Sequence, residues 1–156
     1  MLPIGTLLRG DSYRIEKQIG AGGFGNTYAV RNLSFDEVYA MKEFFMKDIN
    51  LRDGKEVTVS IPNNRSTFES LRNKFMKEAR RLRKLNNVHI VKVHDLFEEN
   101  GTVYYVMDLI DGQSLADFVK QNGPMDELTA MNFFRQMLEA LKVVHCQDPM
   151  MLHLDI

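Results

Sequence analysis

The stretch Gly20-Ala21-Gly22-Gly23-Phe24-Gly25-Asn26-Thr27-Tyr28-Ala29-Val30 decides the fold of this sequence. Its glycines follow a G-x-G-x-x-G spacing, which occurs in dinucleotide-binding folds, in other phosphate-binding loops and in ordinary turns. In a dinucleotide-binding fold the glycines open a helix, whereas residues 26–30 favour a strand. The stretch therefore predicts a hairpin, with strands at residues 13–19 and 27–30. Glycine permits positive φ and lets backbone N–H groups approach phosphate oxygens; a hairpin without any ligand is the alternative.

Lys42 lies in the next predicted strand, residues 37–45, which is rich in aromatic and β-branched residues. Alternation along a strand places Val38, Ala40 and Lys42 on the same face. A lysine on that face would be partly buried, and a buried ammonium needs partners such as phosphate oxygens or a carboxylate. The alternative is an exposed lysine on an edge strand. Lys42 is therefore a candidate phosphate ligand.

Glu78 lies in the clearest predicted helix, residues 67–85, whose apolar residues recur at steps of three and four. Its position between Phe75 and Leu82 in that pattern places it on the apolar face, where an unpaired carboxylate is costly. An inward lysine on a strand and an inward glutamate on the next helix would each supply the partner that the other needs. The sequence thus predicts a Lys42–Glu78 ion pair; the alternative is that Glu78 lies at the edge of the apolar stripe and reaches solvent.

The other predicted elements change from strands to helices along the chain. Residues 47–65 are polar with one short alternating run, which predicts an inserted loop with a small hairpin. Strands are predicted at residues 91–98 and 102–109, on either side of the turn Glu99-Asn100-Gly101.

Two helices are predicted after residue 110. Ser114 is expected to cap a short helix that reaches residue 121, and Asp126 a long one that reaches about residue 147. Strands followed by helices favour an α+β fold.

Composition limits the class of protein without identifying it. The 156 residues are 44% hydrophobic and 26% charged with a formal net charge of -1, which suggests neither nucleic acid nor an anionic membrane as partner. The sequence contains no run of about 18 apolar residues, so no membrane segment is predicted. The first residues do not resemble a signal peptide. The single cysteine, Cys146, fits a reducing cytoplasm.

Four features in this order resemble the eukaryotic-like protein kinase family, and most of all its bacterial serine/threonine branch. They are the glycine motif, Tyr39-Ala40-Met41-Lys42, Glu78 on the helix and His153-Leu154-Asp155 near the end. The resemblance runs from about Tyr13 to Ile156. It implies a protein-kinase-like fold: a five-stranded antiparallel small lobe with one main helix and a hinge (residues 1–110), followed by the first helices of the helical large lobe (residues 111–156).

The resemblance also implies a site for ATP. Lys42 would hold the α- and β-phosphates, Glu78 would brace it, and Asp155 would orient the substrate hydroxyl and accept its proton. The residues expected around the nucleotide are Ile19, Gly20, Ala21, Gly22, Gly23, Phe24, Gly25, Thr27, Ala40, Lys42, Met107, Asp108 and Ile110. Among them, Met107 would gate the back of the pocket, and backbone groups of Asp108 and Ile110 would bind the adenine edge.

The function implied is ATP-dependent phosphoryl transfer to serine or threonine hydroxyls of a protein substrate that the sequence does not identify. The family's magnesium ligands come after its catalytic loop, where this sequence stops, so we expect no metal ligands in the chain and no activity from it alone. A pseudokinase, or another regulatory module that binds a nucleotide or a partner, is the alternative. The helix predicted from Asp126 is apolar on several sides, which predicts self-association.

Overall fold

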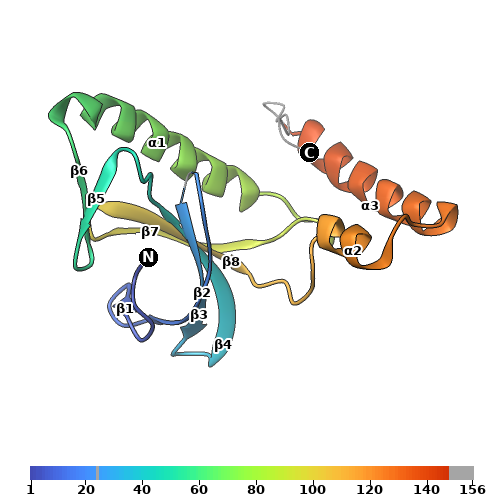
Figure 1. The fold of residues 1–156 in the computed structure, drawn as a ribbon, viewed down its shortest axis with the longest axis horizontal. Coiled ribbons are helices and arrows are strands. Elements are labelled where there is room, and N and C mark those ends of the chain that lie inside the picture. Colours follow the sequence, from blue (N-terminus) through green and yellow to red (C-terminus); the bar gives the residue numbers. More distant parts are fainter. Residues whose placement is uncertain (24, 148–156) are drawn as a thin grey trace. The chain divides into compact units, whose positions relative to one another are not determined.

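The computed structural model describes residues 1–23 and 25–147, which form two compact units (Figure 1). The first unit contains Met1–Lys84 and Lys92–Leu109, and the second contains Leu85–Val91 and the described residues from Ile110 to Gln147. The division into functional lobes at residue 110 stays a prediction.

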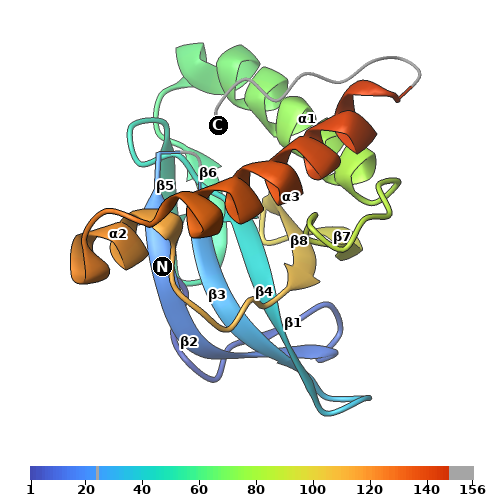
Figure 2. The same cartoon turned by 90° about the vertical axis from the view of Figure 1, so that its right-hand side faces the viewer.

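The first unit is built on a six-stranded antiparallel sheet, whose neighbouring strands β2, β3 and β4 run side by side in Figure 2. The α+β class is confirmed, but the predicted strand number is wrong because the two-residue strand β1 pairs with the start of β2. A strand this short carries no alternation that sequence could reveal. In spatial order the strands are β1 (Leu7–Leu8), β2 (Tyr13–Gly22), β3 (Gly25–Asn32), β4 (Glu37–Phe44), β8 (Thr102–Asp108) and β7 (Val93–Glu99).

Both predicted turns are present. Strands β2 and β3 stay paired up to Gly22 and Gly25, so the glycine motif is the end of a hairpin and does not open a helix. Strands β7 and β8 are joined by Asn100 and Gly101, which both have positive φ, as a tight two-residue hairpin turn requires. The predicted insertion forms its own hairpin from β5 (Asn50–Asp53) and β6 (Glu56–Val59).

The main helix, α1 (Arg65–Leu82), follows the short 3-10 turn η1 (Pro62–Asn64) and packs on one face of the sheet (Figure 1). It buries Phe68, Phe75 and Ala79 against a cluster that includes Phe44 and Tyr105. The other face carries a second core, because successive strand residues point to opposite faces. Its buried residues are Leu2, Leu8, Tyr13, Ile15, Tyr28, Val30, Met41, Phe97, Tyr104 and Val106.

The second unit contains α2 (Leu115–Asn122) and α3 (Glu127–His145). Both predicted caps are confirmed: the Ser114 hydroxyl accepts a hydrogen bond from the Asp117 backbone N–H, and the Asp126 carboxylate accepts one from Thr129. Neither helix has a buried residue in the described part of the chain. Within residues 1–23 and 25–147, no helix is long and apolar enough to cross a bilayer.

Candidate functional site

The glycine hairpin is open at its tip and tightly packed at its base. Gly20, Gly22 and Gly23 are exposed, and a Cβ added at Gly20 or Gly23 would meet no other atom within 4 Å. Gly25 is buried, and a Cβ there would overlap the backbone carbonyl oxygen of Glu43 in β4. Only glycine therefore fits at Gly25, whereas the tip is free to approach a ligand. Ala21 is exposed beside these glycines, and Phe24 lies outside the described residues.

The strand register brings several predicted site residues to one face of the sheet. Thr27 in β3 lies directly opposite Lys42 in β4. Ala40, two residues before Lys42, lies opposite Met107 in β8. Paired residues share a face, as do residues two apart on a strand, so these four side chains form one surface. Ile19 precedes the loop on β2 and is about half exposed.

Lys42 is half-buried on this surface, as the alternation predicts. Its Nζ lies 5.9 Å from the ring centroid of Phe75 in α1 and 5.8 Å from that of Tyr105 in β8. Aromatic faces attract a cation but cannot satisfy its N–H donors. Among the described residues, no carboxylate lies within 4.0 Å of this ammonium. The site therefore fits a phosphate oxygen as the partner of Lys42.

The prediction that Glu78 points inward and pairs with Lys42 is wrong for this structure. Glu78 is exposed, and the two residues form no ion pair. The buried stripe of α1 is centred on Phe68, Phe75 and Ala79, so Glu78 lies at its edge, as the alternative reading of the pattern allowed. Glu78 nevertheless lies near Tyr105, one of the two rings beside Lys42: burial raises the pKa of the Tyr105 hydroxyl, and the negative charge of Glu78 raises it further.

The end of β8 is fixed to the start of β7 through Asp108. The Asp108 carboxylate accepts a hydrogen bond from the backbone N–H of Lys92 (3.0 Å) and lies 2.5 Å from Nε2 of His94. The backbone N–H of Asp108 also donates to the Lys92 carbonyl. Burial opposes ionisation of this carboxyl, but the contacts with His94 and Lys92 outweigh it and lower the pKa of Asp108. Ile110 belongs to the second unit and is exposed.

Sequence reasoning missed Glu43, the neighbour of Lys42. Its side chain is completely buried on the opposite face of β4, where it accepts hydrogen bonds from four side chains, those of Asn26, Tyr28, Arg52 and Tyr104. One signal was available. Alternation places Glu43 on the same face as Met41, in a strand whose neighbours leave no free edge.

Two other predictions concern the proton acceptor and the metal ligands. Asp155, the predicted proton acceptor, lies outside the described residues together with His153 and Leu154. Within residues 1–23 and 25–147, no group of three or more His, Cys, Asp or Glu side chains could hold a metal ion.

Comparison with known proteins agrees with this geometry. The sequence profile described as "Protein kinase domain" matches residues 13–156, so the chain belongs to the protein kinase domain family. The chain is 31% identical over 145 residues to "Probable serine/threonine-protein kinase zyg-1" of Caenorhabditis briggsae. It is 28% identical over 144 residues to "Serine/threonine-protein kinase PrkC" of Bacillus subtilis. The predicted resemblance to serine/threonine kinases, including the bacterial type, is confirmed.

A solved structure shows the same fold. "PpkA-294 apo form" superposes with a TM-score of 0.91 at 26% identity and covers all of this chain. The chain spans 55% of that solved chain. The alignment with zyg-1 includes 93% of this chain and 17% of the zyg-1 protein. The alignment with PrkC includes 92% of this chain and 19% of the PrkC protein.

Proposed function

We propose that the full-length protein transfers the γ-phosphate of ATP to serine or threonine hydroxyls of a protein substrate. The observation that carries this proposal is the half-buried Lys42 ammonium, which lies over two aromatic rings and shares a face with Thr27 and Ala40. No carboxylate of the described residues pairs with it. A cation in such a place is suited to a polyphosphate.

The small lobe's own residues would bind and orient the nucleotide. The exposed glycine tip brings backbone N–H groups to the phosphates. Lys42 contacts the α- and β-phosphates, while Ile19, Thr27 and Ala40 cover the adenine.

The end of β8 would hold the adenine edge through the backbone of Asp108 and Ile110, with Met107 behind it. The contacts of the Asp108 carboxylate with His94 and Lys92 support this assignment, because they fix the strand end from the side-chain direction. A bound magnesium ion would neutralise negative charge on the phosphate that is transferred.

The complete reaction is proposed for a whole kinase domain, since the chain spans 55% of the solved PpkA-294 chain. In that domain Asp155 would accept the proton of the substrate hydroxyl. We expect the 156 residues alone to bind nucleotide weakly and to transfer no phosphate. We also place the protein in the cytoplasm, where the single cysteine, Cys146, would remain reduced.

Radiolabelled phosphate transfer by the full-length protein tests the proposal. Wild type is expected to label a generic protein substrate or itself, and Lys42→Met to lose at least about a hundredfold in rate, because the charge on the phosphates is left unpaired. Asp155→Asn should be similarly impaired. Lys77→Met, which removes an exposed lysine of α1, is the matched control and should keep wild-type activity.

Two results would contradict the proposal. Nucleotide binding by a full-length protein that transfers no phosphate would favour the regulatory module instead. Equal activity of Lys42→Met and Lys77→Met would remove Lys42 from the site.

A further inference from the structure

The Glu43 carboxylate is a charge placed in the core of the first unit. Its side chain is 0% exposed, and its ion-pair partner Arg52 is 13% exposed. A carboxylate withdrawn from water is tolerated only when it is paired and fully hydrogen-bonded. Here both oxygens are satisfied: Oε1 by Arg52 (2.6 Å) and Tyr104 (3.0 Å), and Oε2 by Asn26 and Tyr28 (2.8 Å each).

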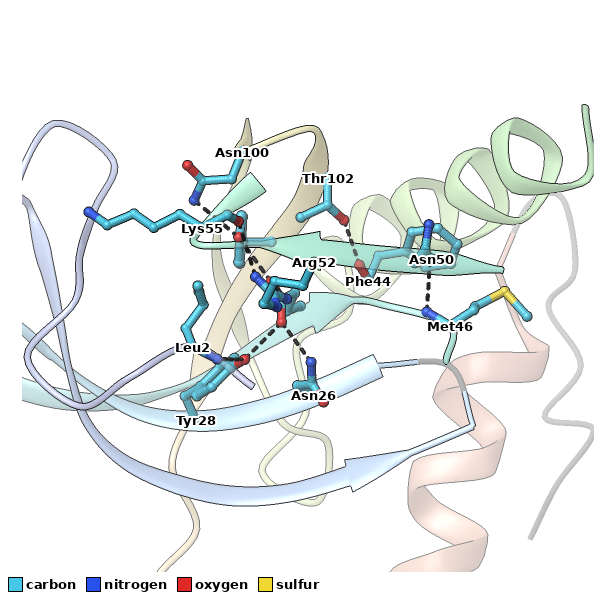
Figure 3. Close-up of polar contacts among 12 residues, drawn as sticks. Leu2, Asn26, Tyr28, Phe44, Met46, Asn50, Arg52, Lys55, Asn100 and Thr102 are labelled. Atoms are coloured by element: carbon cyan, nitrogen blue, oxygen red, sulfur yellow. Dashed lines mark hydrogen bonds and ion pairs between the residues drawn. The ribbon is translucent and has the colours of Figure 1, made fainter. Parts of the chain in front are cut away.

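The donors come from separate segments, as Figure 3 shows for Asn26, Tyr28 and Arg52, whose polar ends converge. Asn26 is the first residue after the glycine motif, and Arg52 belongs to the inserted β5–β6 hairpin. The backbone of Glu43 also contacts the motif, because its carbonyl oxygen occupies the space of a Cβ at Gly25. The returning strand of the glycine loop is thus fixed to the Lys42 strand by both the side chain and the backbone of Glu43.

Arg52 makes further contacts within and beside the β5–β6 hairpin. The Arg52 guanidinium donates to the Lys55 carbonyl (3.1 Å) and lies 4.9 Å from the ring centroid of Phe45. The hairpin itself is docked on the sheet, since the Val57 N–H donates to the Asn100 carbonyl (2.8 Å) in the β7–β8 turn. A continuous chain of contacts therefore runs from the β7–β8 turn through the hairpin and Glu43 to Asn26.

A purely structural role would not require this chemistry. Well-packed apolar side chains of similar volume often stabilise a core as well as a buried ion pair does. Hydrogen bonds differ from apolar contacts because they also fix direction. A directional network is useful where a strand must be held in one position, and Glu43 is adjacent in sequence to Lys42 and bonded to the residue after Gly25.

We infer that Glu43 and Arg52 form a positioning pair, through which the β5–β6 hairpin sets the position of the glycine loop over the nucleotide phosphates. This inference rests on the proposed kinase function. Neither residue touches the nucleotide; Glu43 acts through Asn26 and the strand of Lys42, and Arg52 acts through Glu43.

Steady-state kinetics on the full-length protein test the pair, with Arg52→Gln, Asn26→Ala and the double variant. Each single change is expected to raise the KM for ATP about three- to tenfold with a smaller effect on kcat, because it loosens phosphate binding. Since both act through Glu43, the double variant should be no worse than the poorer single one. Arg52→Lys keeps the positive charge but loses the planar guanidinium with its several N–H donors. Its KM for ATP should therefore lie between those of wild type and Arg52→Gln.

The matched control is Arg31→Gln. It breaks an Arg31–Glu16 ion pair of 2.6 Å on the same β2–β3 hairpin, away from the glycine motif. It is expected to lower the melting temperature and to leave the KM for ATP unchanged. Should Arg52→Gln fail to fold, Asn26→Ala and Arg52→Lys carry the comparison, and the change expected for Arg52→Lys is the smaller one.

Hydrogen exchange at the backbone amides of residues 20–25 separates failure of the inference from failure of the kinase proposal, because it needs no phosphate transfer. Faster exchange there in Arg52→Gln, but not in Arg31→Gln, is expected. The inference is overturned if Arg52→Gln and Asn26→Ala change the KM and the exchange no more than Arg31→Gln does, or if their effects on KM add. An inactive wild type with the expected exchange pattern would refute only the kinase proposal.

Discussion

Lys42 and Glu43 are neighbours in the sequence, and the pleat of β4 sends their side chains to opposite faces of the sheet. The lysine lies over Phe75 and Tyr105 without a carboxylate partner among the described residues, whereas the glutamate is fully paired in the core. The same short strand therefore carries a charge available to a ligand and a charge used to hold the strand in place.

Replacing Gly25 by alanine should destabilise the protein, because the new Cβ would overlap the Glu43 carbonyl oxygen in two paired strands. We expect a loss of about 1–3 kcal/mol in the free energy of unfolding, the usual cost of overpacking. Chemical denaturation measures it. Gly23→Ala, where a Cβ would meet no other atom within 4 Å, serves as the control, and equal stability of the two variants would contradict the packing seen at Gly25.

Asp108 should make the stability of the protein depend on pH in acid. Its pKa is lowered in the folded state by His94 and Lys92, against the effect of burial. The stabilisation is therefore complete above the unfolded pKa of about 4 and is lost as the pH falls through the lower folded value. Thermal melts between pH 6 and about pH 2 should show a shallower acid decline for Asp108→Asn than for wild type; identical slopes would rule this out.

At the residue level, sequence predicted what alternation controls and missed what distant contacts control. Strand period placed Lys42 on the surface shared with Ala40. The helical periodicity gave the wrong orientation for Glu78, because a residue at the edge of an apolar stripe can face either the core or the solvent. Glu43 was missed because its partners Asn26, Arg52 and Tyr104 are 9 to 61 residues away along the chain.

Among the elements, the β5–β6 hairpin connects parts that are far apart in the sequence. Its alternating valines predicted a hairpin, but its docking on the β7–β8 turn depends on a backbone bond between Val57 and Asn100 that no local pattern encodes. The ends of α1 show the same limit. Leu85 continues the apolar period that predicted a helix to residue 85, yet the helix ends at Leu82 and Leu85 belongs to the second unit.

Shortening the Val57 side chain should loosen this docking. Val57 is 4% exposed, so Val57→Ala removes buried methyl groups and is expected to cost about 1–3 kcal/mol of unfolding free energy. The neighbouring Thr58 is exposed, and Thr58→Ala should change stability by less than about 0.5 kcal/mol. Indistinguishable denaturation curves for the two variants would show that the hairpin does not pack as described.

For the whole molecule, the fold class and the order of the long elements followed from the sequence because each long element has its own hydrophobic period, and α2 and α3 also have their own side-chain caps. In the described part of the chain, neither helix of the second unit has a buried residue, and α3 leaves several large apolar side chains uncovered. On α3 the exposed fractions are 73% for Leu128, 61% for Met131, 60% for Phe134 and 64% for Leu138.

We expect the 156-residue chain to self-associate through these α3 side chains, because a contiguous apolar patch favours burial. Light scattering should show a mass above the monomer that falls towards it in a Phe134→Glu, Leu138→Glu double variant. Phe35, which is 74% exposed in the first unit, provides the control: Phe35→Glu should leave the association unchanged. A monodisperse wild-type monomer would refute this prediction.

The central claim is that the Lys42 ammonium lies beside the phosphates of bound ATP. An acyl-phosphate derivative of ATP measures this directly, because the amine nearest the phosphates attacks the acyl carbon, forms an amide and releases ATP. Peptide mass spectrometry on the full-length protein should find the acyl group on Lys42 and find its yield suppressed by excess ATP, while the exposed Lys17 and Lys77 stay at background. Labelling of Lys42 no greater than that of Lys17 and Lys77, or unchanged by ATP, would contradict the account.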